Sequence, residues 1–299
     1  MMNKKIISFM TGILLLIPWL SFANTIYMET RSDSPIVSSL YTVDNSSGVA
    51  SKVGDIKTST GDDLTINDIA YDPGNQTMYA ITINRLWNLN YASGNGVITA
   101  TALGETGISV RQGLEVIGST IYTGTSKTSS ASGALYTLDP VTGTATKVGS
   151  GFGDFGAAGT YVGLVGDLAY NHGKLYATMR WSGPDHVGTY LATIDLDTGL
   201  ATQVGKILAE SISPTIDGIV FENDVLYGVA QGNADNPGTL YYLTIPDNPG
   251  EVIATRIGTN TGAYAAWGLT STVPLPPSAL LLGSGLLGLG LLGWRRKNT

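Results

Sequence analysis

Three aspartates hold the same position in a sequence pattern that recurs along this chain. Asp68, Asp167 and Asp217 each stand at the start of a short apolar segment. Carboxylates gathered from separate repeats can bind Ca²⁺, which favours several oxygen ligands. They can also serve as the acid and base of a glycosidase, whose two carboxyls lie ~5–9.5 Å apart across a glycosidic bond. The commonest use is structural, because an aspartate at a strand start accepts backbone N–H bonds and caps a turn.

Other side chains at or beside this position complete a candidate ligand or ion site. Arg111 is the nearby cation, and Glu115 is a charged residue within one of the apolar segments. The predicted site consists of Asp68, Arg111, Gln112, Glu115, Asp167, Asp217 and Trp267. The sequence contains no nucleophile elbow, phosphate loop or zinc-binding motif, so we assign no catalytic residue. No cofactor is expected, with Ca²⁺ as the one ion that the three aspartates suggest.

The aspartates belong to a repeat array. Five segments share a strand, a tight turn and a second strand, and they begin at Leu40, Leu86, Leu135, Leu191 and Leu240. Between them lie copies of a second unit, in which a turn and a Tyr-containing strand follow the first strand. These copies begin at Asn67, Gln112, Gly166 and Asp217. Repeats of ~50 residues with four short strands each are typical of β-propeller blades.

The local chemistry of one repeat explains why it forms a hairpin. The segment Leu135–Leu138 alternates apolar and polar residues, as a half-buried strand does. The following Asp-Pro-x-Thr-Gly sequence is typical of a turn, in which Asp139 caps the loop and Gly143 takes a positive φ. The same chemistry is expected at Asp195 and Gly199.

The two ends of the array complement each other. The body opens at Thr25-Ile26-Tyr27, which matches the Tyr strand and lacks the strand before it, and Ala266 to Thr270 matches that missing strand. The sequence therefore predicts an all-β, five-bladed β-propeller of four-stranded antiparallel blades, with the N- and C-terminal strands sharing one blade. A ring of six or seven blades and an open β-solenoid are the alternatives. The strand composition resembles bacterial surface propeller repeat proteins of the YVTN or quinoprotein-like type.

Both ends of the chain carry export features. Residues 1–23 form a predicted signal peptide, with Lys4 and Lys5 before the apolar run and cleavage between Ala23 and Asn24. Residues 24–272 form the propeller domain. Residues 273–299 begin with a proline motif, continue through the uncharged run 278–294 and end with three cations. At ~1.5 Å per helical residue this run is near the lower limit for crossing a bilayer.

The tail resembles the PEP-CTERM sorting signal of Gram-negative bacteria in its VPLP variant. The residues that carry the resemblance are Val273, Pro274, Leu275, Pro276 and Pro277, and Leu275 replaces the usual glutamate. The resemblance implies export through the Sec translocon, transient insertion of the tail helix in the inner membrane and processing by an exosortase. The destination would be the cell surface, the outer membrane or the extracellular matrix. An ordinary C-terminal membrane anchor is the alternative.

The charge balance narrows the function. The chain has 16 Lys and Arg residues and 23 Asp and Glu residues, and five of the cations but none of the acids lie in the two end segments. The strongly acidic body argues against binding nucleic acid or anionic membrane surfaces. The resemblance of the tail to the sorting signal implies an exopolysaccharide-rich biofilm, because exosortase systems accompany exopolysaccharide production. Together with the acidic body and the lack of an assembled catalytic set, it leads us to expect a non-enzymatic binding or scaffold protein with a polysaccharide or protein ligand. The alternative is a secreted glycan-cleaving enzyme that uses Asp68, Asp167 and Asp217.

Overall fold

The structure is a computed structural model that describes residues 25–31, 37–91, 96–110, 112–128, 130–156, 160–181, 188–210, 212–232, 237–263 and 266–272. All of these residues belong to one compact unit, Thr25–Val273. The predicted signal peptide and sorting tail lie outside the described residues. Within the described ranges, no helix has the length and apolar character needed to cross a membrane.

The described residues are built from strands, which confirms the all-β prediction. The strands are β1 (Thr25–Arg31), β2 (Ser38–Val43), β3 (Ala50–Thr58), β4 (Asp68–Asp72), β5 (Thr77–Ile81), β6 (Arg85–Asn90), β7 (Val97–Glu105), β8 (Leu114–Ile117), β9 (Thr120–Gly124), β10 (Leu135–Leu138), β11 (Ala145–Lys147), β12 (Val162–Asn171), β13 (Lys174–Trp181), β14 (Tyr190–Ile194), β15 (Ala201–Leu208), β16 (Ile216–Glu222), β17 (Val225–Ala230), β18 (Thr239–Thr244), β19 (Gly250–Ile257) and β20 (Ala266–Thr272).

Antiparallel pairing groups these strands into runs of four. Strands β4 to β7, β8 to β11, β12 to β15 and β16 to β19 each pair in chain order. The remaining run is β20-β1-β2-β3, in which the last strand pairs antiparallel with the first. The predicted pairing of the two ends of the body is thus confirmed. Parallel contacts of β3 with β7 and of β15 with β19 join the runs into three sheets.

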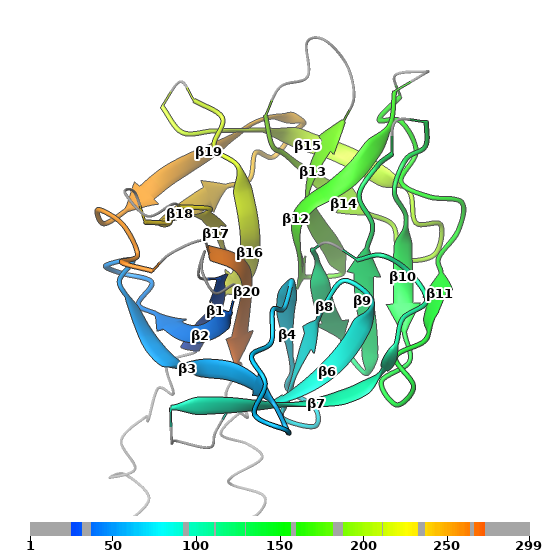
Figure 1. Cartoon of the computed structure of the whole chain (residues 1–299). Helices are drawn as coiled ribbons and strands as arrows, with labels where there is room; N and C mark the ends of the chain where they lie inside the picture. Colours follow the sequence, from blue (N-terminus) through cyan, green and yellow to red (C-terminus); the bar gives the residue numbers. More distant parts are fainter. Residues whose placement is uncertain are drawn as a thin grey trace, which may run out of the picture. The chain divides into compact units, whose positions relative to one another are not determined.

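The first strands of the runs meet at the centre of the unit. Strand β4 contacts β8 and β20, strand β12 contacts β8 and β16, and strand β16 contacts β20, so the contacts form a closed cycle. Figure 1 shows these five strands around the middle of the view, with β3, β7, β11 and β19 at the periphery. Each hydrophobic cluster lies between one run and the next, as where Leu114 and Ile121 pack against Ala70 and Ile81.

The predicted turn chemistry is confirmed at the β10–β11 hairpin. The Asp139 carboxylate accepts the N–H groups of Val141 and Thr142, both at 2.8 Å, and Gly143 has φ 74°. The β14–β15 turn repeats this arrangement, with Asp195 accepting the N–H of Thr198 at 2.7 Å and Gly199 at φ 70°. Tight turns of this kind join the third and fourth strands of a run, so that the two strands pair directly as a hairpin.

Candidate functional site

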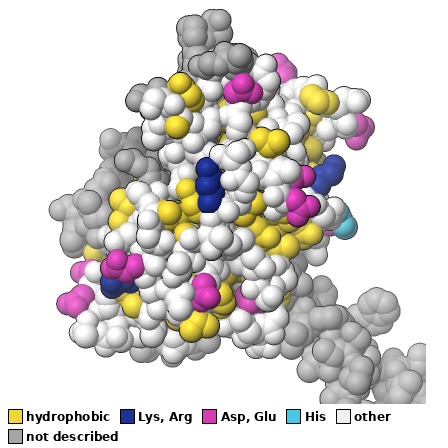
Figure 2. Space-filling view, turned by 90° about the vertical axis from the view of Figure 1, so that its right-hand side faces the viewer, with side chains coloured by type: hydrophobic (Ala, Val, Ile, Leu, Met, Phe, Trp, Pro, Cys, Tyr) yellow, Lys and Arg dark blue, Asp and Glu magenta, His cyan; other side chains and the backbone are white. Residues whose placement is uncertain are grey.

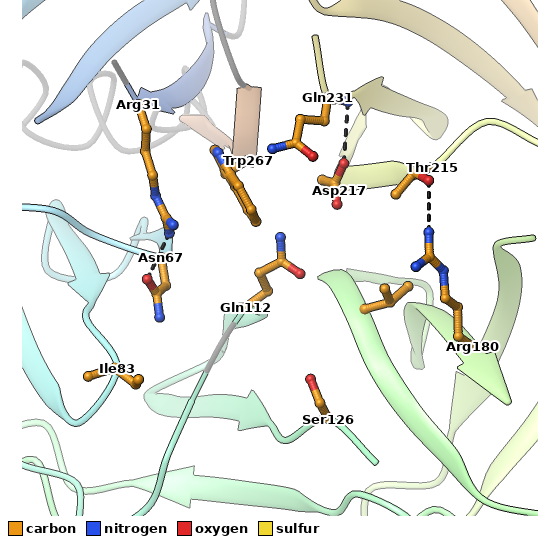
Figure 3. A pocket seen from close by; sticks show the side chains of 11 residues that line it. Arg31, Asn67, Ile83, Gln112, Ser126, Arg180, Thr215, Asp217, Gln231 and Trp267 are labelled. Atoms are coloured by element: carbon orange, nitrogen blue, oxygen red, sulfur yellow. Dashed lines mark hydrogen bonds between the residues drawn. The ribbon is translucent and has the colours of Figure 1, made fainter. Parts of the chain in front are cut away.

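A pocket of about 560 Å³ opens where the first strands of the runs begin. Its floor comes from the starts of these central strands, and its rim comes from residues that follow or end the second strands. The lining residues are Arg31, Asn67, Ile83, Gln112, Ser126, Val165, Arg180, Thr215, Asp217, Gln231 and Trp267. We call this the mouth pocket, and Figure 3 shows it from close by.

The mouth pocket contains three of the predicted site residues, Gln112, Asp217 and Trp267. The sequence analysis missed both of its arginines. Arg31 ends the Tyr strand β1, and Arg180 lies in the equivalent strand β13. The sequence could have indicated both arginines. In an antiparallel pair, the end of the Tyr strand lies beside the start of the central strand, so residues at the two positions share one edge.

Arg31 packs on Trp267 at one side of the pocket. Its guanidinium carbon lies 4.3 Å from the centre of the indole ring, a cation–π contact. Its Nε donates to the carbonyl of Ile66 at 2.8 Å and its Nη2 to Asn67 Oδ1 at 2.7 Å. Four neighbouring groups therefore fix this cation, the fourth being Glu29, whose carboxyl lies 3.8 Å from Nε.

Glu29 does little to neutralise Arg31. The side chain is fully buried, and burial raises its pKa to about 8 against the opposing effects of Arg31 and the Ser38 hydroxyl. The Ser38 hydroxyl donates to Glu29 Oε1, while Oε2 has no hydrogen-bond partner in the described part of the chain. At neutral pH the Glu29 carboxyl is thus largely protonated, and Arg31 keeps its positive charge.

Asp217 and Gln112 lie at the opposite side of the indole from Arg31 (Figure 3). Burial raises the pKa of Asp217 to about 7, although the Gln231 N–H, the Gln112 amide and the Arg180 guanidinium each lower it. The Gln231 N–H donates to Asp217 Oδ2 at 3.3 Å. Gln112 is only 8% exposed, and no described residue accepts a hydrogen bond of good geometry from its Nε2. The Gln112 amide is thus close enough to the Asp217 carboxyl to lower its pKa, but it does not reach the geometry of a hydrogen bond.

The other two aspartates lie out of reach of the pocket. Asp68 and Asp167 are both fully buried, and their carboxyls lie within hydrogen-bonding reach of each other. Burial raises the pKa of both, and the negative charge of Asp167 raises that of Asp68 further. Two buried carboxyls in contact cannot both ionise readily, so the pair holds at least one proton at neutral pH.

Backbone N–H groups surround this carboxyl pair. Asp68 accepts from Ile69 at 2.8 Å and Gly113 at 2.6 Å. Asp167 accepts from Leu168 at 2.6 Å, and its other oxygen accepts from Ile219 at 3.1 Å and Leu269 at 3.2 Å. The pair thereby joins β4 to the start of β8, and β12 to β16 and β20. The two aspartates therefore have a structural role. They accept backbone N–H groups as a turn aspartate does, but they do so between central strands.

The remaining predicted residues add little to the pocket. Arg111 lies outside the described residues. Glu115 stands in β8, does not line the pocket, and has a pKa raised well above its usual range by burial and by the charge of Asp68. In the described ranges, no three His, Asp or Glu side chains are grouped so that they could hold a metal ion. The geometry therefore gives no support to the Ca²⁺ site that the repeat pattern suggested.

The side chains that line the mouth pocket can form hydrogen bonds, charge interactions and ring contacts with a ligand. A glycosidase needs two carboxyls separated by the bond that they cleave. Asp68 and Asp167 contact each other and do not line the pocket, and Asp217 is the one carboxyl that lines it among the described residues. Two arginines, several amides and an indole can instead hold a polar ligand by hydrogen bonds and charge.

The face of the unit seen in Figure 2 is mainly acidic. Figure 2 shows acidic side chains scattered over one face of the unit, with few basic ones among them. This agrees with a body in which acids outnumber cations, and it makes a pocket with two arginines unusual for this chain.

Comparison with known proteins leaves the activity open. No protein family and no curated protein sequence matches this chain. Among solved structures, the fold is similar to a candidate 6-phosphogluconolactonase from Bacteroides uniformis, with a TM-score of 0.40 and 12% sequence identity over 81% of this chain and 84% of that chain. A likeness of this size says nothing about what this chain binds.

Proposed function

We propose that this chain is an exported, non-enzymatic binding module of the bacterial cell surface or extracellular matrix. Its scaffold is a five-bladed β-propeller, and its binding site is the mouth pocket. The observation that carries the proposal is the pocket itself, in which Arg31, Arg180, Gln112 and Trp267 converge and Asp217 is the one lining carboxyl among the described residues. A ligand in an exopolysaccharide-rich matrix is the most natural occupant of a site with this polar lining.

The five-bladed architecture is supported by two independent observations. The central strands of the runs contact one another in a cycle of five, β4-β8-β12-β16-β20. The hydrophobic clusters also follow this cycle, since the last one packs Ile26 and Met28 of β1 against Val229 and Leu240 of the final run. Both are expected of a closed ring in which every blade packs on two neighbours. An experimental structure with another blade count would overturn the count and leave the binding site in place.

The export part of the proposal rests on the sequence ends. A signal peptide ending at Ala23 and a VPLP-type sorting tail from Val273 imply passage through the Sec translocon and processing by an exosortase. Mass spectrometry of the protein recovered from the cell surface is expected to give a chain that begins at Asn24 and lacks Trp294. An intact C-terminus found in the inner membrane would instead favour a simple membrane anchor.

The binding part is tested with the polysaccharide of the producing bacterium. We expect the full chain, purified in a non-ionic detergent, to be retarded in a gel that contains the polysaccharide. Trp267→Ala should abolish the retardation, whereas a variant on the outer strand β19, Arg256→Gln, should not. Equal retardation of both variants would remove the mouth pocket from the proposal.

The same polysaccharide distinguishes the binding proposal from the alternative of a glycan-cleaving enzyme. If sugars are released from the polysaccharide by the wild-type chain and not by Asp217→Asn, the binding-only proposal fails. We place this alternative second, because Asp217 has no carboxyl partner across the pocket among the described residues.

A further inference from the structure

The mouth pocket is positively charged on an acidic protein. Arg31 and Arg180 both line it, and Asp217 is the one carboxyl that lines it among the described residues. Burial raises the pKa of Asp217 to about 7, so that this carboxyl is only partly ionised at neutral pH. The rest of the body repels anions, because its acids outnumber its cations. The pocket is therefore where an anionic group would find a favourable charge.

Arg180 has donors to offer. Its guanidinium carries five N–H groups, and within the described residues one hydrogen bond is recorded, from Nη2 to Thr215 Oγ1 at 2.8 Å. The side chain is exposed to solvent at the rim. Arg31, by contrast, is held by Ile66, Asn67 and Trp267. A planar guanidinium with free N–H groups binds a carboxylate through two parallel hydrogen bonds.

The side-chain amides of the pocket can bind uncharged polar groups of a ligand whose carboxylate pairs with Arg180. Gln112 and Gln231 point from opposite sides toward the space beside Trp267 (Figure 3). The buried Gln112 Nε2 faces the Asp217 carboxyl but makes no hydrogen bond of good geometry in the described structure. A hydroxyl or ring oxygen of a ligand would give it a better-placed acceptor. Amides beside an indole are a common lining for sugars, whose surface is both polar and flat.

We infer that the mouth pocket binds a carboxylate-bearing sugar, such as a uronic acid of an acidic polysaccharide, with the carboxylate paired to Arg180 and the sugar oxygens facing Gln112 and Gln231. This inference rests on the proposed binding function and adds the chemical class of its ligand.

The test uses isothermal titration calorimetry on the full chain in non-ionic detergent. The probes are glucuronate, its uncharged methyl ester, glucose and acetate. We expect glucuronate to bind about tenfold or more tightly than the ester and glucose, because charged hydrogen bonds contribute more than neutral ones. Acetate should bind much more weakly than glucuronate, because it lacks the sugar oxygens.

Substitutions assign the preference to a residue. Arg180→Gln should remove the preference for glucuronate over its ester, and Arg180→Lys should restore part of it. The control is Arg256→Gln, which removes the same charge from the exposed face of β19. All variants should unfold at the wild-type temperature, since both arginines are exposed.

The possible outcomes are distinguishable. If glucuronate, its ester and glucose bind equally, the inference fails and the proposed binding function stands. If acetate binds as tightly as glucuronate, the site is a carboxylate site and the sugar is rejected. If the preference survives in Arg180→Gln, the assignment to that arginine is overturned. If no sugar binds at tens of millimolar and the polysaccharide is also not retained, both proposals fall.

Discussion

Some residues of the mouth pocket are expected to favour ligand binding without stabilising the folded chain. Gln112 is the clearest case, because its buried Nε2 makes no hydrogen bond of good geometry in the described structure. We predict that Gln112→Met, which keeps the length of the side chain and removes the amide, leaves the free energy of unfolding unchanged or raises it by up to ~1 kcal/mol. Glucuronate affinity should fall about tenfold in the same variant. Urea unfolding and calorimetry measure the two effects, and a loss of stability without a loss of binding would contradict the prediction.

Asp217 should make binding of an anion depend on pH. Burial raises its pKa to about 7, and the groups that face it are the Gln231 N–H, the Gln112 amide and Arg180. Above pH 7 its negative charge opposes a ligand carboxylate and competes for Arg180. We therefore predict that glucuronate affinity is highest near pH 5–6 and falls about tenfold by pH 8.

The matched control for this pH effect is Asp217→Asn, which has no charge to gain. Its affinity for glucuronate should stay nearly constant between pH 5 and 8, apart from a smaller loss as Glu29, with a pKa of about 8, begins to ionise beside Arg31. A wild-type affinity that does not change over this range would contradict the role given to Asp217.

At the scale of the elements, one carboxylate joins three central strands. Asp167 in β12 accepts N–H groups of Leu168, of Ile219 in β16 and of Leu269 in β20, the last 102 residues along the chain. We predict that Asp167→Ala lowers the free energy of unfolding by ~3 kcal/mol or more, because it leaves these buried donors unpaired. Asp167→Asn keeps one acceptor oxygen and should cost clearly less.

The control for the Asp167→Ala prediction is Asp195→Ala. This aspartate also accepts backbone N–H groups, but it does so in an exposed turn where water can replace it. Urea unfolding of the full chain compares the variants. Equal losses for Asp167→Ala and Asp195→Ala would mean that the central carboxyl does no more than a turn cap.

Part of the fold and of the site could be predicted from the sequence, and these residues show which part. The Asp139 turn and the pairing of β20 with β1 were predictable, because both follow from local turn chemistry and from strand patterns that recur. The contact between Asp68 and Asp167 was not predictable, because it depends on how far each central strand slides into the ring. A shift of one residue decides whether an aspartate faces the pocket or the buried centre.

The two arginines of the mouth pocket also could not be assigned to a site from the repeat pattern alone. Arg31 is the last residue of β1 and Arg180 the last but one of β13, and the repeat pattern located both of these Tyr strands. Only the pairing register brings the two strand ends to the start of the central strands. The repeat thus predicted where a site would form, and the packing of the ring decided which side chains line it.

The whole molecule carries several acids whose pKa is higher in the folded chain than in the unfolded one. Burial raises the pKa of Glu29 to about 8 and that of Asp217 to about 7, and it raises those of Asp68, Glu115 and Asp167. Such groups hold a proton more tightly when folded. Their contribution to stability is therefore complete below pH ~4, the unfolded value, and is lost as the pH rises toward 8.

The turn aspartates act in the opposite sense but over a lower range. Hydrogen bonds from Ser46 and Ser47 lower the pKa of Asp44 to about 2, and backbone N–H groups lower those of Asp139 and Asp195. Their contribution is present above pH ~4 and is lost as the pH falls below it. The two sets together place the stability maximum of the folded unit near pH 4–5.

We predict that the thermal midpoint of the full chain falls by roughly 10 °C between pH 5 and pH 8, given ~2–4 °C per kcal/mol for a unit of this size. Repulsion among the surface acids works in the same direction, and salt separates the two causes. Molar NaCl screens exposed charges and leaves buried carboxyls nearly unaffected. The fall should therefore persist in 1 M NaCl if it arises at the central strands. A fall that disappears in salt would assign it to the acidic surface instead. Asp167→Asn provides the second check, because a side chain that cannot ionise should flatten the dependence between pH 5 and 8 even where it lowers the midpoint itself.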